Sequence, residues 1–172
     1  SANFGITPAP TVTSVTCVVA SVVYTGSALT PCSATVTGPG GLSLTPTPSY
    51  GLNTNVGTAT ASVAYAAAGN YLGSNDSKNF SISQAASATV VTCPASAVYT
   101  GAAITPCLAQ VTGVGGLNQA VSPVTYGSNT SVGSATAGAT FAGALNHAGS
   151  SGSNAFAITT ATSSTSVSCP SR

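Results

Sequence analysis

The chain has 172 residues, enough for one large domain or two small ones, and a formal net charge of +1. Its charged side chains are Asp76, Lys78 and Arg172, so it lacks the clustered basic residues with which proteins bind nucleic acid or anionic membranes. No apolar run approaches the roughly 18 residues of a transmembrane helix, and the first residues lack the charged and apolar regions of a signal peptide.

The sequence repeats itself with a constant period. Cys17 corresponds to Cys93 (93 − 17 = 76), and Tyr24 corresponds to Tyr99 (99 − 24 = 75). The same period continues beyond the second repeat, because Cys169 follows Cys93 at the same interval (169 − 93 = 76). We therefore predict the end of a preceding repeat at residues 1–10, two repeats at 11–86 and 87–162, and the start of a following repeat at 163–172. A tandem array of this kind is typical of structural or adhesive proteins.

The apolar residues within each predicted repeat alternate as they do in strands. The predicted strands, with their counterparts in the second repeat, are residues 11–17 (87–93), 22–24 (97–99), a segment around Ala34 and Val36 (Ala109 and Val111), 57–65 (133–141) and a last strand with Phe80 and Ile82 (Phe156 and Ile158). The clearest is 57–65, where small apolar residues face one side and mostly hydroxyl residues the other. This period of two indicates a half-buried antiparallel strand.

Turn-forming residues separate these strands. They are Pro-Gly-Gly at 39–41, Asn-Thr-Asn at 53–55, Asn70 and Gly73. Six or seven short strands in about 76 residues, without helical spacing, predict an all-β fold of small β-sandwiches. Because residues 83–86 alone link the two repeats, we expect the sandwiches to stack end to end with limited bending.

Five cysteines occupy fixed places in the repeat. A short interval separates Cys17 from Cys32 (32 − 17 = 15) and Cys93 from Cys107 (107 − 93 = 14), so each repeat is predicted to close its own disulfide. Each bond should contribute about 3 kcal/mol to a unit with a thin, Ala-rich core. We expect Cys169 to bond to a cysteine at the same short interval further along the chain, or to a neighbouring subunit. Such a framework implies an oxidising, extracellular setting.

Other uses of these cysteines are free structural thiols, a metal site or a catalytic thiol. A zinc site needs close Cys/His spacing, which the sequence lacks. A catalytic thiol needs a histidine, and the single histidine, His147, corresponds to Tyr71 in the first repeat (147 − 71 = 76). We therefore expect no metal and no cofactor.

A surface with so little charge has weak colloidal repulsion. We therefore expect the protein to associate with itself or to carry covalent sugar on some of its 52 Ser and Thr residues or on asparagine. Asn75, Asn79 and Asn129 each begin an Asn-x-Ser/Thr pattern and are candidate N-glycosylation sites.

Catalysis is not expected. Asp76 is the sole carboxylate side chain, which excludes paired-carboxylate chemistry within one chain, and its counterpart is Gly152. An isopeptide bond from Lys78 would need an acidic helper in an apolar core, and the second repeat has Asn154 at that place. The Gly-rich segments 38–41 and 113–116 are not followed by Lys and a helix, so hairpin turns are expected rather than phosphate-binding loops.

Aromatic and hydroxyl residues offer two further readings. Tyr50 and Tyr126 recur at the period of the repeat (126 − 50 = 76), which favours packing, with a sugar-binding platform as the alternative. Thr-x-Thr pairs such as residues 58–60 raise the alternative of ice binding, but the pairs do not recur at a short, regular period.

A series of motifs recurs in the same order in both repeats. In the first they are Tyr24-Thr25-Gly26, Pro31-Cys32, 37–42, 53–59, Tyr65-Ala66, Asn70 and Gly73-Ser74, and in the second 99–101, Pro106-Cys107, 112–117, 129–135, Phe141-Ala142, Asn146 and Gly149-Ser150. Together they resemble the bacterial Ig-like repeats found in large secreted and cell-surface proteins. The resemblance implies an Ig-like sandwich. Such repeats commonly carry a Gly-Asp-Ala-Asn turn, and residues 67–70 and 143–146 lack its Asp, so the resemblance implies no cation site here.

We therefore expect an extracellular or cell-surface structural protein that forms a stalk, fibre or filament from disulfide-stapled Ig-like repeats. Its partners would be neighbouring repeats or other copies, and strand donation through the first residues (Phe4, Ile6) or the last (Val167, Cys169) would satisfy open sheet edges. The alternative is a set of spacer modules in a cell-surface adhesin whose binding domain lies elsewhere. A carbohydrate-binding module is a third reading.

Overall fold

The computed structural model describes residues 2–170 and shows an all-β chain. The contacts of these residues divide them into two compact units. Unit 1 extends to Ala85 and also contains the segment Ala144–Ala148, while unit 2 comprises Ala86–Gly143 and the residues from Gly149 onward. The predicted flanking segments 1–10 and 163–172 reach residues 1, 171 and 172, which lie outside the described residues.

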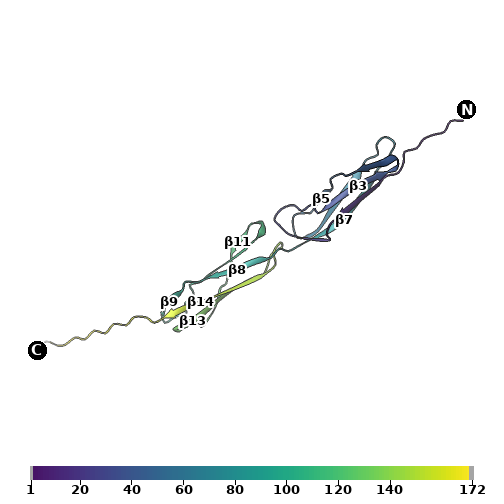
Figure 1. The fold of residues 1–172 in the computed structure, drawn as a ribbon. Helices are drawn as coiled ribbons and strands as arrows, with labels where there is room; N and C mark the ends of the chain where they lie inside the picture. Colours follow the sequence, from purple (N-terminus) through teal and green to yellow (C-terminus); the bar gives the residue numbers. More distant parts are fainter. Residues whose placement is uncertain (1, 171–172) are drawn as a thin grey trace. The chain divides into compact units, whose positions relative to one another are not determined.

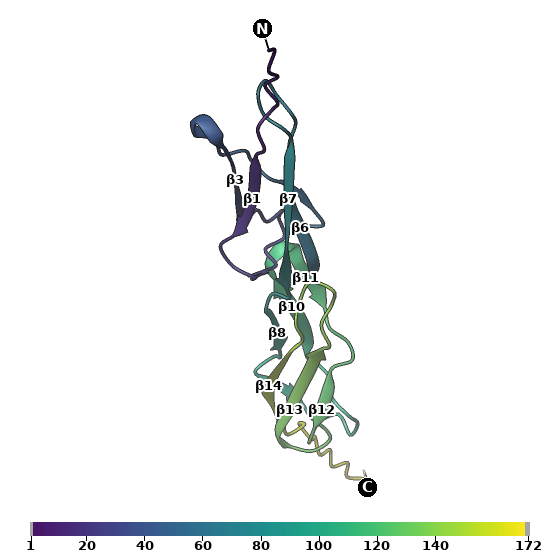
Figure 2. The ribbon, with the colours of Figure 1, turned by 90° about the vertical axis from the view of Figure 1, so that its right-hand side faces the viewer.

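Unit 1 has a three-stranded and a four-stranded sheet (Figure 1). The three-stranded sheet is antiparallel, in the order β1 (Val12–Cys17), β3 (Cys32–Gly38), β4 (Leu42–Leu44). The four-stranded sheet has the order β2 (Ser21–Val23), β7 (Ser74–Ser83), β6 (Gly57–Tyr65), β5 (Ser49–Gly51), in which β2 pairs parallel with β7. Figure 2 shows β1 and β3 beside β6 and β7, and β1 packs against both β6 and β7.

Unit 2 has the same two kinds of sheet. Its three-stranded sheet has the order β11 (Leu117–Ala120), β10 (Leu108–Gly113), β8 (Ser87–Thr92). Its four-stranded sheet has the order β12 (Thr125–Gly127), β13 (Gly133–Phe141), β14 (Ser150–Thr159), β9 (Ser96–Val98), and β9 pairs parallel with β14. Each strand of unit 2 therefore has a counterpart of similar place and pairing in unit 1.

The core of each unit lies between its two sheets, because alternate residues of the strands point inward. In β6, Ala59 and Ala61 are fully buried while the hydroxyl residues between them are exposed. Ala61 clusters with Val15 and Ala34 of the other sheet, and Ala59 clusters with Phe80 and Ile82 of β7. The corresponding core of unit 2 includes Val91, Val111, Ala135, Ala137, Phe156 and Ile158.

The observed strands confirm the all-β prediction, and β6 covers the predicted residues 57–65. Strands β4 and β5 were not predicted, because their short sequences lie among the Gly, Pro and Asn residues that were assigned to turns. β7 begins at Ser74, earlier than the predicted last strand, because its polar first half pairs along the length of β6.

Two glycine turns lie where hairpin turns were predicted. The 3₁₀ turn η1 (Pro39–Gly41) joins β3 to β4, and η2 (Val114–Gly116) joins β10 to β11. Gly40 and Gly115 have φ of +70° and +65°, a backbone conformation that other residues adopt at a steric cost.

Hydroxyl groups connect the two sheets of each unit at one edge. The hydroxyl oxygen of Ser74 lies 2.7 Å from those of both Thr11 and Thr13. In unit 2 the hydroxyl oxygen of Ser150 lies 2.8 Å from those of Ser87 and Thr89. Neutral hydrogen bonds therefore join the two sheets of each unit at these positions.

Candidate functional site

Both predicted intra-unit disulfides are present. Cys17 is bonded to Cys32 and Cys93 to Cys107, with S–S distances of 2.06 and 2.08 Å. Each bond lies within one unit and joins cysteines that are close in the sequence. Cys169 is an exposed free thiol within the described part of the chain, and the intermolecular or downstream bond predicted for it stays a prediction.

A tyrosine hydroxyl holds the backbone at each of the second cysteines. The Tyr50 hydroxyl accepts a hydrogen bond from the backbone N–H of Cys32 at 3.0 Å and donates one to its carbonyl oxygen at 2.8 Å. Tyr126 makes the same pair of bonds with Cys107, at 2.9 and 3.1 Å. Both tyrosines are half-buried and pack edge-on against the core phenylalanine of their unit. Their hydroxyls and rings therefore serve packing, the reading that the sequence favoured over a sugar platform.

The three candidate glycosylation sites differ in their surroundings. Asn75 and Asn79 lie on β7 with exposed side chains, and the Asn79 side-chain oxygen accepts a hydrogen bond from Thr60. Asn129 is half-buried, and its side-chain nitrogen donates a 3.0 Å hydrogen bond to the carbonyl oxygen of Ile104. Because N-glycosylation attaches sugar to that nitrogen, we expect Asn75 and Asn79 to be modified in preference to Asn129.

Asp76 contributes to the fold of unit 1. Its carboxylate accepts a 2.8 Å hydrogen bond from the backbone N–H of Val15, on the opposite sheet. This bond, then one from the backbone of Ser77 and the nearby charge of Lys78, lowers the pKa of the Asp76 carboxyl below its ordinary value. The counterpart Gly152 leaves no room for a side chain, because a Cβ there would lie 2.3 Å from the carbonyl oxygen of Thr89.

A hollow of about 870 Å³ lies in unit 2 beside the disulfide. Its lining includes Cys107, Val121, Val124 and Tyr126. The lining residues carry no charged side chain, and the Tyr126 hydroxyl is engaged with the backbone. The lining also includes the hydroxyl residues Thr92, Thr105 and Ser122, and it contains no His, Asp, Glu or Lys that could act as their general base.

Within residues 2–170 we find no cluster of three His, Cys, Asp or Glu side chains placed to hold a metal ion. The same residues contain no helix with the length and apolar character needed to cross a bilayer.

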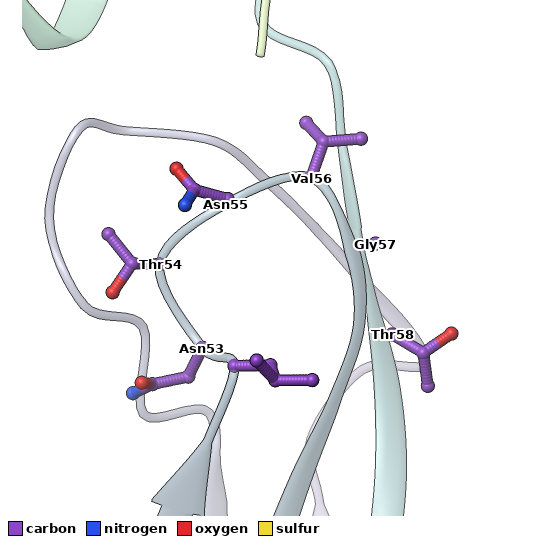
Figure 3. A pocket seen from close by; sticks show the side chains of 7 residues that line it. Asn53, Thr54, Asn55, Val56, Gly57 and Thr58 are labelled. Atoms are coloured by element: carbon purple, nitrogen blue, oxygen red, sulfur yellow. The ribbon is translucent and has the colours of Figure 1, made fainter. Parts of the chain in front are cut away.

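The loop between β5 and β6 forms one end of unit 1 and makes hydrogen bonds with the side chain of Asn146. Residues 52–58 line a hollow of about 360 Å³, and Asn55 and Val56 project from the tip of the loop (Figure 3). The side-chain oxygen of Asn146 accepts a hydrogen bond from the backbone N–H of Val56 at 2.9 Å. The side-chain nitrogen of Asn146 donates to the side-chain oxygen of Asn55 at 3.0 Å.

The rest of the segment Ala144–Ala148 adds backbone and ring contacts within unit 1. The backbone N–H of Ala85 donates to Asn146, and that of Ala148 donates to the carbonyl oxygen of Ala85, at 3.0 and 2.8 Å. His147 is buried, with its ring edge-on to Tyr24 at 5.4 Å between centroids. We call Ala144–Ala148 the turn segment of unit 1, and we call Tyr24, Asn55, Val56 and Ala85 its end surface.

Sequence reasoning missed this site. It treated residues 53–55 and Asn146 as turn residues and weighed His147 as a thiol partner. A usable signal is that an asparagine recurs at residues 70 and 146, in turns of otherwise different sequence.

No family model matches the chain, and no curated protein matches it.

Proposed function

We propose that this chain is an extracellular structural protein whose Ig-like units, each closed by its own disulfide, follow one another in tandem and form a stalk, fibre or filament. The observation that carries the proposal is the recurrence of the same contacts at the period of the repeat. Asn53 exchanges hydrogen bonds with Leu29, and Asn129 exchanges the same two with Ile104. A chain that repeats its internal contacts in this way repeats a building block rather than an active site.

The disulfides support the extracellular part of the proposal. Two disulfides per chain are typical of proteins that function in an oxidising compartment. Each closes a short loop, which stabilises a unit whose core consists largely of Ala and Val. A structural protein outside the cell needs that covalent reinforcement, because a small unit buries little apolar surface.

The surface supports self-association. Several apolar side chains are exposed on the described residues, among them Phe4, Leu52, Leu108 and Leu145. With three charged side chains in the sequence, little electrostatic repulsion keeps copies apart. Copies of the chain, neighbouring repeats and covalent glycans are therefore the partners we propose, without catalytic activity or a cofactor.

Electron microscopy of the purified, oxidised protein at increasing concentration tests the proposal. We expect elongated assemblies, together with an intact mass that rises by the mass of the added hydrogen atoms on full reduction of the two disulfides and falls on deglycosylation. Dispersed monomers at every concentration would contradict the filament. With the disulfides intact, that result would favour spacer modules of an adhesin.

A further inference from the structure

The outer face of the three-stranded sheet in unit 2 is apolar at two neighbouring places. Leu108 on β10 and Val90 on β8 lie next to buried residues of their strands and point away from the core, with exposed fractions of 77% and 57%. In the register of the two strands Leu108 pairs with Thr92 and Gln110 pairs with Val90, so Leu108 and Val90 are diagonal neighbours on that face. Two large aliphatic side chains are therefore exposed close to each other.

Unit 1 has hydroxyl residues at the same two places. In the register of the repeat Val90 corresponds to Ser14 (90 − 14 = 76) and Leu108 corresponds to Ser33 (108 − 33 = 75). Both serines are exposed, and they are diagonal neighbours as well. The fold of a unit therefore does not require apolar residues at these places.

The hollow of about 870 Å³ in unit 2 adjoins this apolar pair. Its lining combines the exposed Leu108 with the buried Cys107 and Val121, so an apolar recess lies directly beside an exposed apolar side chain. The corresponding hollow of unit 1, lined by residues 32–35 and 45–48, measures about 380 Å³. That hollow is open although a whole unit follows it in the sequence, so its openness does not depend on a chain end.

We propose that Val90, Leu108 and the adjoining hollow form a surface of unit 2 that binds the same surface of a second copy of this chain. This inference rests on the proposed function, in which copies associate, and it names the surface by which they do so. The surface fits a copy of itself because it carries both parts of the contact, an exposed leucine and an apolar recess beside it. Two copies related by a two-fold axis would each place Leu108 in the hollow of the other.

The polar groups of this surface allow it to be buried. None of the residues that form it is charged, so two like surfaces meet without repulsion and without burying a charge. Gln110, which pairs with Val90, donates its side-chain N–H to the side-chain oxygen of Asn118, and the Tyr126 hydroxyl is engaged with the backbone of Cys107. Burying these groups leaves their hydrogen bonds in place.

A second copy also accounts for the apolar residue outside the hollow. A small apolar molecule would fill the recess, but it would leave Val90, which is not part of the lining, in water. A sheet face of a second copy is wide enough to cover Val90 and the recess together, because neighbouring strands lie about 4.8 Å apart.

Sedimentation velocity on a Cys169→Ser background tests the proposal without intermolecular thiol exchange. The parent should associate as its concentration rises. Leu108→Ser should raise the concentration of half-association about tenfold or more, because each two-fold contact loses two buried leucine side chains. Val90→Ser should change it in the same direction. Both variants should keep the fold, since unit 1 carries serine at the same places.

The matched control is Val98→Ser on β9, in the other sheet of unit 2, because this valine is 57% exposed, as Val90 is. The control should associate like the parent. Thermal melts of the three serine variants should agree with that of the parent, which shows that a change in association is not a loss of fold.

A mixture of parent and Leu108→Ser chains tests the two-fold symmetry. A pair with one chain of each kind loses one of its two leucine contacts. Fluorescence-detected sedimentation of labelled variant with unlabelled parent should therefore give a half-association concentration between those of the two pure proteins. If Leu108 instead contacted a different surface of its partner, the parent would bind the variant at full strength, and that result would overturn the self-contact.

The outcomes separate this inference from the proposed function. Elongated assemblies that form equally in the Leu108→Ser and Val98→Ser variants would overturn this surface and leave the filament standing. Dimers that Leu108→Ser weakens, without longer assemblies at any concentration, would support the surface and contradict the filament. Monomers at every concentration would overturn both. Binding of Nile red to those monomers, weakened by Leu108→Ser, would assign the hollow to a small apolar molecule instead.

Discussion

Replacing Asn146 by Ala should destabilise unit 1, although this residue is 90 positions away from Val56 in sequence. The Asn146 side chain makes two hydrogen bonds, a partly buried one with Val56 at 2.9 Å and an exposed one with Asn55 at 3.0 Å. At about 0.5–1.5 kcal/mol for each bond, their loss should lower the unfolding free energy of unit 1 by about 1–2 kcal/mol. That corresponds to a change of about 5- to 30-fold in its folding equilibrium.

Hydrogen exchange and denaturant unfolding measure this effect. The backbone amide of Val56 should exchange faster in N146A, together with that of Ala148, which donates to Ala85. The control is N70A, since Asn70 occupies the matching turn with an exposed side chain and should change stability by less than about 0.5 kcal/mol. Equal behaviour of N146A and N70A would refute the reasoning, because the Asn146 side chain would then contribute nothing to unit 1.

Three further perturbations have expected outcomes. Asp76 has a lowered pKa in the folded state, so its stabilising bond with Val15 is present above the ordinary value of 3.8 and lost as pH falls through the folded pKa. D76N should remove that acid-dependent part of the stability in a pH series. Gly152→Ala should cost about 1–3 kcal/mol, because its Cβ would lie 2.3 Å from the carbonyl oxygen of Thr89. Gly138→Ala, with no contact closer than 3.5 Å, should be neutral or slightly stabilising, and thermal melts of both variants compare them. Reducing the disulfides should lower the unfolding free energy of each unit by about 3 kcal/mol, measured by urea titration with and without reductant.

Local pattern was sufficient to predict the long strands and the disulfides. Residues 57–65 alternate small apolar with mostly hydroxyl side chains, and this alternation determines which face is buried. The cysteine spacing was sufficient for pairing because Cys17 lies opposite Cys32 in the register of β1 and β3. The strand alternation and the disulfide pairing depend on residues that are close in the sequence, so both can be predicted from it.

Features that depend on distant backbone could not be predicted in this way. Asp76 and Gly152 occupy the same place in the two repeats, and from the sequence this place was interpreted as a variable charged position. In the fold, the Asp76 carboxylate accepts a hydrogen bond from Val15 on the opposite sheet of unit 1. Gly152 lies directly against the backbone of Thr89 in unit 2. The bond from Val56 to Asn146 likewise joins residues 90 positions apart, and no periodicity reports such a contact. Sequence pattern thus predicted the all-β class and the disulfides but not the surface of unit 1 that holds the turn segment.

The hydroxyl contacts of Ser74 and Ser150 have a consequence for the conditions that this protein tolerates. Dissolved ions weaken attractions between formal charges, and they act little on bonds between neutral hydroxyls. A fold joined at its sheet edges by Thr and Ser should therefore change its melting temperature little when the ionic strength rises from dilute to physiological, where screening is the main effect of salt.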